Sequence, residues 1–405
     1  MAGDFVRAGV GQSTNRKPEL AGREAAERAV AQLAGQVPKL VLVFATAGYD
    51  QAPLLAAVRA VTGDAPLSGC SGSGVITQLG SDERSHVVGV MALTGDRLRG
   101  AALLAPGTSA DSRAAGRELA RQVRALALGE ERALLVFPDG LTTNSTELLA
   151  GLRADLSLPC AVVGGCAGDA FTLDRTYQYR GAEVISGGVA ALLLAGDLRM
   201  EIDVSHGCEP LGVEQTITKA EGGWVQEIGG RPAWSFFKEF LEPGAEDLDA
   251  LNIAYLCLAE RLPAELRSAY GEFIIRVPLS LQRETGALFF PGGLQTGTGV
   301  HVALRRREEV ARRAVESAQR LVARQGPARP TAVLQFDCVG RGRLLFGERT
   351  TPELIEPLQQ ALGRELPWLG VHTYGEIAPV SGQTYFHNFT GVLCALYEGS
   401  GEAGR

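Results

Sequence analysis

The sequence predicts an α/β protein of repeated strand–helix–strand–turn–strand units that form helix-covered sheets. Two observations support this fold class. Short apolar runs alternate with segments whose apolar residues recur three and four positions apart, which is typical of strands that alternate with helices. The same succession occurs three times along the 405 residues. Such alternation implies sheets with helices packed on them.

Each unit begins with a short apolar run that ends in phenylalanine, at residues 40–44 (LVLVF), 133–137 (ALLVF) and 332–336 (AVLQF). A helical pattern follows, at residues 54–60, 147–153 and 354–362. Each unit then reaches a glycine turn, at residues 65–74, 159–169 and 367–375. A last strand is expected at residues 88–96, 188–197 and 390–397. The alternative is three generic units that share only their periodicity, and we favour true repetition.

The segment between the second and third units differs from them and predicts an additional α+β region. A strand is expected at 202–206, and a hairpin at 216–228 turns at Gly222 and Gly223. A helix at 231–241, a loop at 243–249 and strands at 272–277, 287–290 and 300–304 follow. A helix at 308–324 is expected to bury Val310, Ala314, Val315, Ala318, Leu321 and Val322. Its arginines, at 305–307, 312 and 313, are expected to form a solvated face.

We expect an N-terminal domain at residues 1–200 with two units, a C-terminal domain at 201–397 with the additional segment and the third unit, and a disordered tail at 398–405. The formal net charge of −7 and the pI near 5.5 argue against nucleic-acid binding, which needs a basic surface. The sequence has no uninterrupted apolar run of about 18 residues, so it predicts no membrane insertion. Seven dispersed cysteines and the absence of a secretory leader favour a reduced, cytoplasmic protein.

Common cofactor motifs are incomplete. Residues 69–74 (GCSGSG) resemble half of a P-loop but lack the following Lys and Ser or Thr, and no GxGxxG follows a strand. The five histidines show no zinc spacing, so we expect neither metal nor cofactor. His86, His206 and His301 are expected to be ordinary core or surface residues, whereas His372 and His387 flank the third glycine turn.

The three glycine turns are the predicted site. Where a strand ends in glycine, backbone N–H groups form a concavity that suits a carboxylate or another small anion. Because ligands of open α/β sheets lie beyond the carboxyl ends of the strands, the three turns are expected to converge on one pocket. The candidate ligand-binding residues are Ser71, Ser73, Cys166, Asp169, Arg341, His372, Tyr374, Glu376, His387 and Asn388. Arg341 either pairs with a ligand carboxylate or forms a structural salt bridge with Glu376.

A thiol nucleophile is the alternative. Cys70 and Cys166 lie in glycine turns at what look like matching places in the first two units. In that case the protein is a hydrolase or transferase. Small buried residues beside tight turns explain both cysteines as well, and no neighbouring His or Asp activates either. We therefore expect no catalytic residue.

Several motifs, in order along nearly the whole chain, resemble the FIST family of sensory proteins. The carriers are residues 69–76 (GCSGSGVI), 163–169 (VGGCAGD), 206–212 (HGCEPLG), 227–233 (EIGGRPA), 338–342 (CVGRG), 374–379 (YGEIAP) and 386–390 (FHNFT). The resemblance implies a bacterial intracellular sensor with FIST N- and C-terminal parts. Its expected ligand is a small polar metabolite such as an amino acid.

The resemblance carries no catalytic residues over to this chain. About eight residues follow the sensor, so we expect signal transduction to pass through a separate protein partner. A homodimer is an open possibility.

Overall fold

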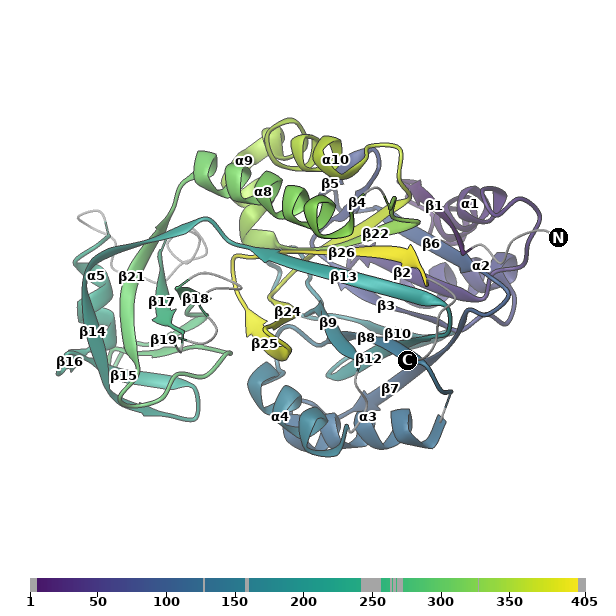
Figure 1. The fold of residues 1–405 in the computed structure, drawn as a ribbon. Helices are drawn as coiled ribbons and strands as arrows, with labels where there is room; N and C mark the ends of the chain where they lie inside the picture. Colours follow the sequence, from purple (N-terminus) through teal and green to yellow (C-terminus); the bar gives the residue numbers. More distant parts are fainter. Residues whose placement is uncertain are drawn as a thin grey trace, which may run out of the picture.

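The computed structural model describes residues 6–399, except residues 127, 157–159, 242–255, 263, 265–266, 268–271 and 327. Three six-stranded sheets form the body of the protein, and a fourth sheet belongs to an inserted domain that lies to one side of it (Figure 1). The predicted mixed α/β class with helix-covered sheets is confirmed. The loop expected at 243–249 and most of the expected tail lie outside the described residues.

Unit 1 contains two helices, four long strands and a short hairpin. Its elements are β1 (Arg7–Ser13), α1 (Pro18–Ala31), β2 (Leu40–Thr46), α2 (Gln51–Thr62), β3 (Leu67–Gly72), β4 (Val75–Thr77), β5 (Gly80–Asp82) and β6 (Val88–Thr94). Asp50 caps α2 by accepting a hydrogen bond from the backbone N–H of Ala52, which explains where that helix begins.

Unit 2 has the same succession of elements. They are β7 (Arg99–Pro106), α3 (Ser112–Leu126), β8 (Glu131–Pro138), α4 (Ser145–Asp155), β9 (Ala161–Gly165), β10 (Gln178–Arg180), β11 (Glu183–Ile185) and β12 (Gly188–Ala195). Asn144 caps α4 through the N–H of Glu147.

Unit 3 follows the same plan, but the inserted domain separates its first strand from its first helix. Its elements are β13 (Leu198–Ser205), α8 (Arg307–Gln325), β22 (Ala332–Cys338), α9 (Arg343–Phe346), α10 (Glu356–Leu362), β23 (Trp368–Thr373), β24 (Glu376–Val380), β25 (Gln383–His387) and β26 (Gly391–Glu398). Short turns of 3-10 helix at Val339–Arg341 and Gly347–Arg349, and a π-helical turn at Thr351–Ile355, surround α9.

The inserted domain is mostly antiparallel sheet. It contains β14 (Cys208–Glu221), β15 (Trp224–Ile228), β16 (Arg231–Pro232), α5 (Ala233–Lys238), β17 (Leu256–Arg261), β18 (Phe273–Arg276), β19 (Ser280–Gln282), β20 (Ala287–Phe289) and β21 (Gly299–Arg305). The predicted hairpin is confirmed, because β14 and β15 pair up to Glu221 and Trp224 and the turn lies at Gly222 and Gly223.

The three body sheets have equivalent strand orders, and each is completed by a hairpin from another unit. The orders are β1-β6-β2-β3-β10-β11, β7-β12-β8-β9-β24-β25 and β13-β26-β22-β23-β4-β5. The β4–β5 hairpin of unit 1 joins the sheet of unit 3, that of unit 3 joins the sheet of unit 2, and that of unit 2 joins the sheet of unit 1. Through this cyclic exchange, each unit is hydrogen-bonded to both of the others.

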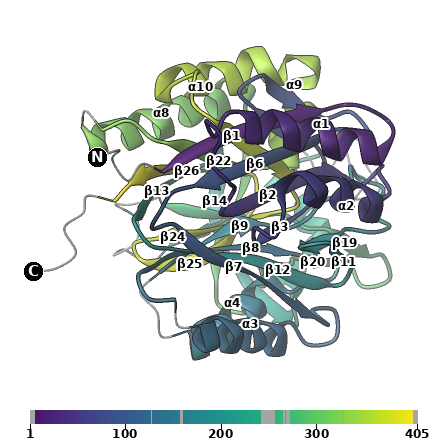
Figure 2. The same ribbon diagram turned by 90° about the vertical axis from the view of Figure 1, so that its right-hand side faces the viewer.

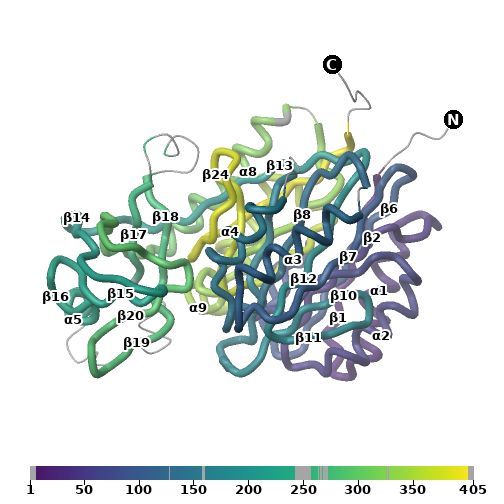
Figure 3. The backbone as a smooth tube through the Cα atoms, turned by 90° about the horizontal axis from the view of Figure 1, so that it is seen from below, coloured from purple at the N-terminus to yellow at the C-terminus, as the bar shows by residue number. Residues whose placement is uncertain are grey.

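The sheets enclose a shared core and carry helices on their outer faces. Helices α1 and α2 cover the first sheet, α3 and α4 the second, and α8 and α10 the third, as the end-on view shows (Figure 2). The view from below shows α3 and α4 lying across the second sheet (Figure 3). The inner faces of all three sheets contribute to one hydrophobic cluster. Both sides of each sheet are therefore buried, which explains why the strands are apolar runs without alternation.

The phenylalanine at the end of each apolar run lies at the centre of this core. Phe44, Phe137 and Phe336 are fully buried, and their ring centroids lie 5.5 to 6.1 Å apart in all three pairs. Aromatic pairs at such distances stabilise beyond their buried area. The recurring phenylalanine of the sequence is thus the residue through which the three units meet.

The strand register places one glycine at an equivalent position in each of the three units. Gly69, Gly164 and Gly370 pair with residues of β2, β8 and β22 at corresponding places. A Cβ atom on them would lie 1.9, 2.0 and 2.6 Å from a carbonyl oxygen of the neighbouring strand. Glycine is therefore required for close approach of the strands.

This register corrects the expected match between Cys70 and Cys166. Cys70 is one residue beyond Gly69, whereas Cys166 is two residues beyond Gly164. Cys166 therefore corresponds to Ser71, and the position of Cys70 is taken by Gly165 in unit 2. The two thiols are not equivalent, because the apparent match came from glycine spacing and not from strand pairing.

The structure differs from the pattern predicted for helix α8 at three positions. Val310, Ala314, Ala318 and Leu321 are buried as expected, but Val315 is only partly buried and Val322 is 42% exposed. The arginines at 312 and 313 do form a solvated face with Glu309 and Glu316. Arg305 does not belong to this solvated face, because Arg305 is the last residue of strand β21 and is buried.

The predicted units also missed several elements. Each unit begins with an additional strand, β1, β7 or β13, and contains the short exchanged hairpin within the region expected to be a turn. The domain boundary expected between residues 200 and 201 falls inside β13. No helix among the described residues is long and apolar enough to cross a membrane.

Candidate functional site

The three glycine turns meet at the carboxyl ends of β3, β9 and β23. The N–H of Gly168 donates to the carbonyl of Ser71 (3.0 Å), and the N–H of Ser73 donates to the carbonyl of His372 (2.9 Å). Unit 2 and unit 3 are joined in the same way by the N–H of Tyr374 and the carbonyl of Cys166 (3.0 Å). The turns thus form a closed junction between the units.

This junction corrects the expected anion cradle. The N–H groups of Ser73, Cys166, Gly168 and Tyr374 all donate to carbonyl oxygens of other turns. The hydroxyls of the first turn are used as well, since Ser71 Oγ donates to the carbonyl of Gly168 (2.9 Å). Because these donors already have partners, they hold the units together instead of facing a ligand.

Asp169 organises the loop that follows β9. Its Oδ2 accepts hydrogen bonds from Thr172 Oγ1 (2.8 Å) and from the N–H groups of Asp174 and Arg175 (2.8 and 3.1 Å), and its Oδ1 accepts one from the Tyr374 hydroxyl. Burial alone would raise the pKa of Asp169, but these hydrogen bonds hold it below the usual value. The carboxylate is therefore ionised, and its acceptors are occupied.

Arg341 is fully buried and pairs with Asp337, not with Glu376. Its Nε lies 3.0 Å from Asp337 Oδ1, and its Nη1 donates to the carbonyl of Ser205 (2.7 Å). The salt bridge expected as the alternative therefore has a different partner. Arg341 Nη2 is buried without a hydrogen-bond partner among the described residues.

Glu376 is a buried acid beside this pair. Thr373 Oγ1 donates to its Oε1 (2.7 Å), and the N–H and Oγ1 of Thr390 donate to its Oε2 (3.1 and 2.6 Å). Burial raises the pKa of Glu376 to about 8, although these hydrogen bonds lower it, and nearby Asp337 also raises it. Glu376 is therefore protonated over much of the neutral range.

Replacing Glu376 with glutamine is expected to remove a pH dependence of stability. An unfolded glutamate has a pKa of about 4.3, so the stability contributed by the buried acid is complete below that pH and is lost as the pH rises to about 8. The glutamine of Glu376→Gln has nearly the same shape as the glutamate but does not ionise. Its stability relative to the wild type should increase by about 1.4 kcal/mol per pH unit across this window.

Urea denaturation of both proteins at about pH 5, 6.5 and 8 measures this difference. His387 is present in both proteins, so its own pH dependence cancels. Parallel stability profiles for the two proteins would show that Glu376 is ionised in the folded state.

The two histidines of the third turn are fully buried. Burial lowers the pKa of His387 to about 3, and its Nε2 lies 3.1 Å from the carbonyl oxygen of Ala378. His372 Nε2 lies 2.8 Å from Ser81 Oγ and 3.7 Å from Glu83 Oε1, whereas its buried Nδ1 has no hydrogen-bond partner in the part of the chain that the structure describes. A catalytic triad needs the carboxylate on the opposite ring nitrogen from the serine, so this cluster lacks that geometry.

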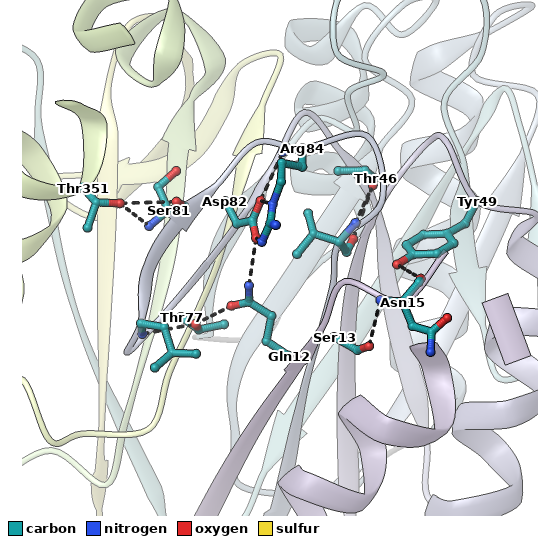
Figure 4. Close-up of polar contacts among 12 residues, drawn as sticks. Gln12, Ser13, Asn15, Thr46, Tyr49, Thr77, Ser81, Asp82, Arg84 and Thr351 are labelled. Carbon is teal, nitrogen blue, oxygen red and sulfur yellow. Dashed lines mark hydrogen bonds and ion pairs between the residues drawn. The ribbon is translucent and has the colours of Figure 1, made fainter. Parts of the chain in front are cut away.

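Ser81 and Glu83 line a polar cavity of about 410 Å³ between units 1 and 3, which we call the polar pocket. Figure 4 shows its polar contacts. Asp82 accepts hydrogen bonds from Gln12 Nε2 (3.2 Å) and Arg84 Nε (2.8 Å), and Thr351 Oγ1 accepts one from the N–H of Ser81 (3.0 Å). These groups satisfy one another and join the β4–β5 hairpin to unit 3.

The thiols of Cys70 and Cys166 are buried within the body. Burial raises the pKa of the Cys70 thiol well above its usual range and that of Cys166 to about 12. Cys166 Sγ lies 3.4 Å from Ser145 Oγ. A protonated, buried thiol is a weak nucleophile.

A second cavity, which we call the interdomain pocket, lies where the body meets the inserted domain. It has a volume of about 380 Å³. The body contributes turn residues of units 2 and 3, and the inserted domain contributes the connection from β18 to β19. The lining residues are Gly140, Leu141, Phe171, Leu173, Val277, Leu279, Ser280, Cys338, Val339, Gly340, Leu344, Tyr374, Asn388 and Phe389.

Two of the predicted site residues, Tyr374 and Asn388, line the interdomain pocket. The Tyr374 hydroxyl accepts a hydrogen bond from the N–H of Phe171 (2.6 Å), and Asn388 Oδ1 accepts one from the N–H of Val277 (3.3 Å). Asn388 thereby connects the inserted domain to the body. The other eight predicted residues lie in the junction of the turns or behind it.

Sequence reasoning missed the apolar walls of this pocket. Phe171, Leu173 and Phe389 have left-handed backbone conformations, with φ of 65°, 53° and 53°. Such conformations are costly for bulky residues and cluster at functional sites. No residue pattern in the sequence signals a left-handed phenylalanine. The exposed apolar Phe171 and Leu173 also lie in a loop rather than in a periodic segment.

The fold and the site together define an α/β protein of three interlocked sheets, with a ligand-sized pocket beneath an inserted β domain. Its family follows from sequence comparison. Models of the FIST N domain and the FIST C domain match residues 39–231 and 233–379, so the chain belongs to the FIST family. FIST domains are sensory domains, and this membership supports a sensor role.

Similar proteins span nearly the whole chain. An uncharacterized protein of Mycobacterium tuberculosis is 30% identical over 399 residues, which cover 97% of this chain and 100% of the relative. An uncharacterized protein of Mycobacterium bovis is 28% identical over 396 residues, with 97% and 99% covered.

Solved structures with similarity to the fold include two enzymes. A chorismatase structure covers 98% of this chain and 99% of its own, with 10% identity and a TM-score of 0.36. A cyanuric acid hydrolase from A. caulinodans covers 98% and 100%, with 10% identity and a TM-score of 0.38. Likeness at this level carries no argument about activity. Among the described residues, no group of His, Cys, Asp and Glu side chains is arranged to hold a metal ion.

Proposed function

We propose that this protein is a non-catalytic sensor that binds a small molecule in the interdomain pocket and signals through a separate protein partner in the cytoplasm. The observation that carries this proposal is the composition of the pocket wall, since two units of the body and the inserted domain all contribute to it. A ligand held there contacts both parts at once. Its binding energy can therefore favour one arrangement of the two parts over another.

The lining favours a ligand with an apolar body and few polar groups. None of the described lining side chains is charged, and leucine, valine and phenylalanine predominate among them. Tyr374, Asn388 and Ser280 are the polar side chains that can orient a ligand. A carboxylate or ammonium group would lose its hydration without gaining a partner. We therefore favour an uncharged, mainly apolar molecule over the amino acid expected from the sequence.

Filling the pocket is expected to abolish ligand binding. Leu279 lines the interdomain pocket from the inserted domain and is 39% exposed, so Leu279→Trp should occupy the cavity without disturbing the core. The matched control is Leu79→Trp, because Leu79 lines the polar pocket and is 75% exposed. The same change there should leave binding intact.

The measurement is a thermal-shift screen with uncharged indoles, phenols and medium-chain alcohols beside amino acids and organic acids. A ligand at about 100 times its Kd adds about 2.7 kcal/mol to native stability. We expect a selective shift from the uncharged apolar group that is lost in Leu279→Trp and kept in Leu79→Trp. A shift from amino acids alone, or one that persists in Leu279→Trp, would contradict the proposed pocket.

A further inference from the structure

Arg305 carries a buried charge that has no carboxylate partner among the described residues. It ends strand β21 at the junction of the inserted domain and the body, and it is 7% exposed. Its Nη1 donates to the carbonyl of Gly340, and its guanidinium carbon lies 3.7 Å from the ring centroid of Phe389. Its Nε and Nη2 are buried with no hydrogen-bond partner among the described residues. A guanidinium stays charged in proteins, so this burial requires a counter-charge.

Three cysteines interact electrostatically with this charge. Cys208 lies directly opposite Arg305 in the pairing of β14 with β21, and Cys257 lies opposite Ala303 in the pairing of β17 with β21. Positions 303 and 305 share one face of the sheet, so both thiols lie on the face of the guanidinium. Cys338 of the body packs with Cys208, Cys257 and Ala303 in one apolar cluster, which we call the Arg305 cluster.

We propose that Cys208 is a thiolate paired with Arg305 and is the site at which this protein is modified by small hydroperoxides. The proposal stands on the unpaired buried cation and on the thiols that face it. It does not require the ligand proposed for the interdomain pocket.

The electrostatics of the cluster favour ionisation of Cys208 over its neighbours. Burial alone would raise the pKa of Cys208, but hydrogen bonding with Cys257 and His206, then the charge of His206 and that of Arg305, lower it below the usual value. Burial raises the pKa values of Cys257 and Cys338. These directions make Cys208 the thiol of the cluster that ionises first.

Other charged groups near the cluster do not replace that charge. The charge of Arg341 lowers the pKa of Arg305, but Arg341 is already paired with Asp337. Glu376 raises the pKa of the Cys338 thiol, and its carboxyl oxygens accept hydrogen bonds from Thr373 and Thr390.

We expect a small neutral oxidant to approach from the interdomain pocket, because the wall of that pocket adjoins the cluster. Cys338, Gly340 and Phe389 line that pocket and also contact the Arg305 cluster. In the reaction, the thiolate sulfur of Cys208 forms a bond to one peroxide oxygen while the O–O bond breaks. The leaving alkoxide or hydroxide takes a proton from solvent. Sulfur is oxidised to a sulfenic acid, and the hydroperoxide is reduced to an alcohol or water.

Cys160 provides an internal comparison, because it is half-buried whereas Cys208 is buried. Burial raises the pKa of Cys160 to about 11. The full chain is treated with hydrogen peroxide and dimedone at about pH 6, where an ordinary thiol is about 99% protonated, and the labelled peptides are quantified by mass spectrometry. We expect Cys208 to be labelled at least about tenfold faster than Cys160, because the thiolate is the reactive form. Faster labelling of Cys160 would overturn the proposal, because exposure would then govern reactivity.

The ultraviolet absorbance of the thiolate tests the ion pair without requiring access. At neutral pH we expect one thiolate per chain, lost in Cys208→Ser and kept in Cys160→Ser. Arg305→Met should remove it and lower dimedone labelling of Cys208 at least about tenfold, whereas Arg305→Lys should retain part of both. Circular dichroism establishes which variants fold. Absence of the thiolate from the wild type overturns the proposal, and a thiolate that peroxide does not oxidise overturns the modification step.

Discussion

Replacing Phe336 with alanine is expected to lower the free energy of unfolding by about 3–5 kcal/mol. Phe336 is fully buried, and its ring meets Phe44 and Phe137 at centroid distances of 6.1 Å. Its removal leaves a cavity bordered by all three sheets, which their paired strands keep from collapsing. The loss includes both the transfer free energy of the ring and the cost of this cavity.

Urea denaturation measures the change, with Phe240→Ala as the matched control. Phe240 is 37% exposed, so the same substitution there removes less buried surface. Phe44→Ala and Phe137→Ala should cost about as much as Phe336→Ala, because the three rings occupy equivalent places. Equal effects of Phe336→Ala and Phe240→Ala would contradict the central role of the three rings.

Replacing Asp337 with asparagine is expected to cost about 3–5 kcal/mol, the range found when one partner of a buried ion pair is removed. Both Asp337 and Arg341 are 0% exposed. Asp337 also accepts a hydrogen bond from Gln335 Nε2 (2.8 Å). The substitution leaves the buried guanidinium of Arg341 without its counter-charge, which is the main part of the expected loss.

The double variant Asp337→Asn with Arg341→Met should be more stable than the sum of the single effects predicts, by about 0.5–3 kcal/mol. The exposed pair of Arg343 and Glu348, 59% and 83% exposed, is the control. Glu348→Gln should cost less than about 1 kcal/mol, because solvent screens that pair. Additive single effects at Asp337 and Arg341 would show that the pair does not stabilise the protein.

The fold class and the three units followed from the sequence, because a strand buried on both faces is a continuous apolar run and a helix has a repeat of 3.6 residues. The phenylalanines that end the runs also identified equivalent positions. The exchanged hairpins could not be predicted in this way. Strands of three residues, such as β4 and β10, carry too little periodicity, and their partners lie in other units.

The predicted site was right about which turns meet and wrong about what their N–H groups do. Donor groups in a glycine turn look available in a sequence, but their partners here come from the other two turns. Arg341 illustrates the same difficulty, because its partner Asp337 belongs to the apolar strand just before it. The pattern of charged residues likewise did not show that Arg305 lies in strand β21 and not on the solvated face of the neighbouring helix.

By itself the sequence determined the helices and central strands of the three units, the burial of those strands and the family, because these depend on residue type and spacing along the chain. The tertiary structure alone decided the cyclic exchange of hairpins, the closure of the turns, and the meeting of the inserted domain with the body. These depend on contacts between residues far apart in the chain. Cys208 and Arg305 are 97 positions apart, yet strand pairing places them face to face. The chemistry of that pair arises from burial, which only the folded chain provides.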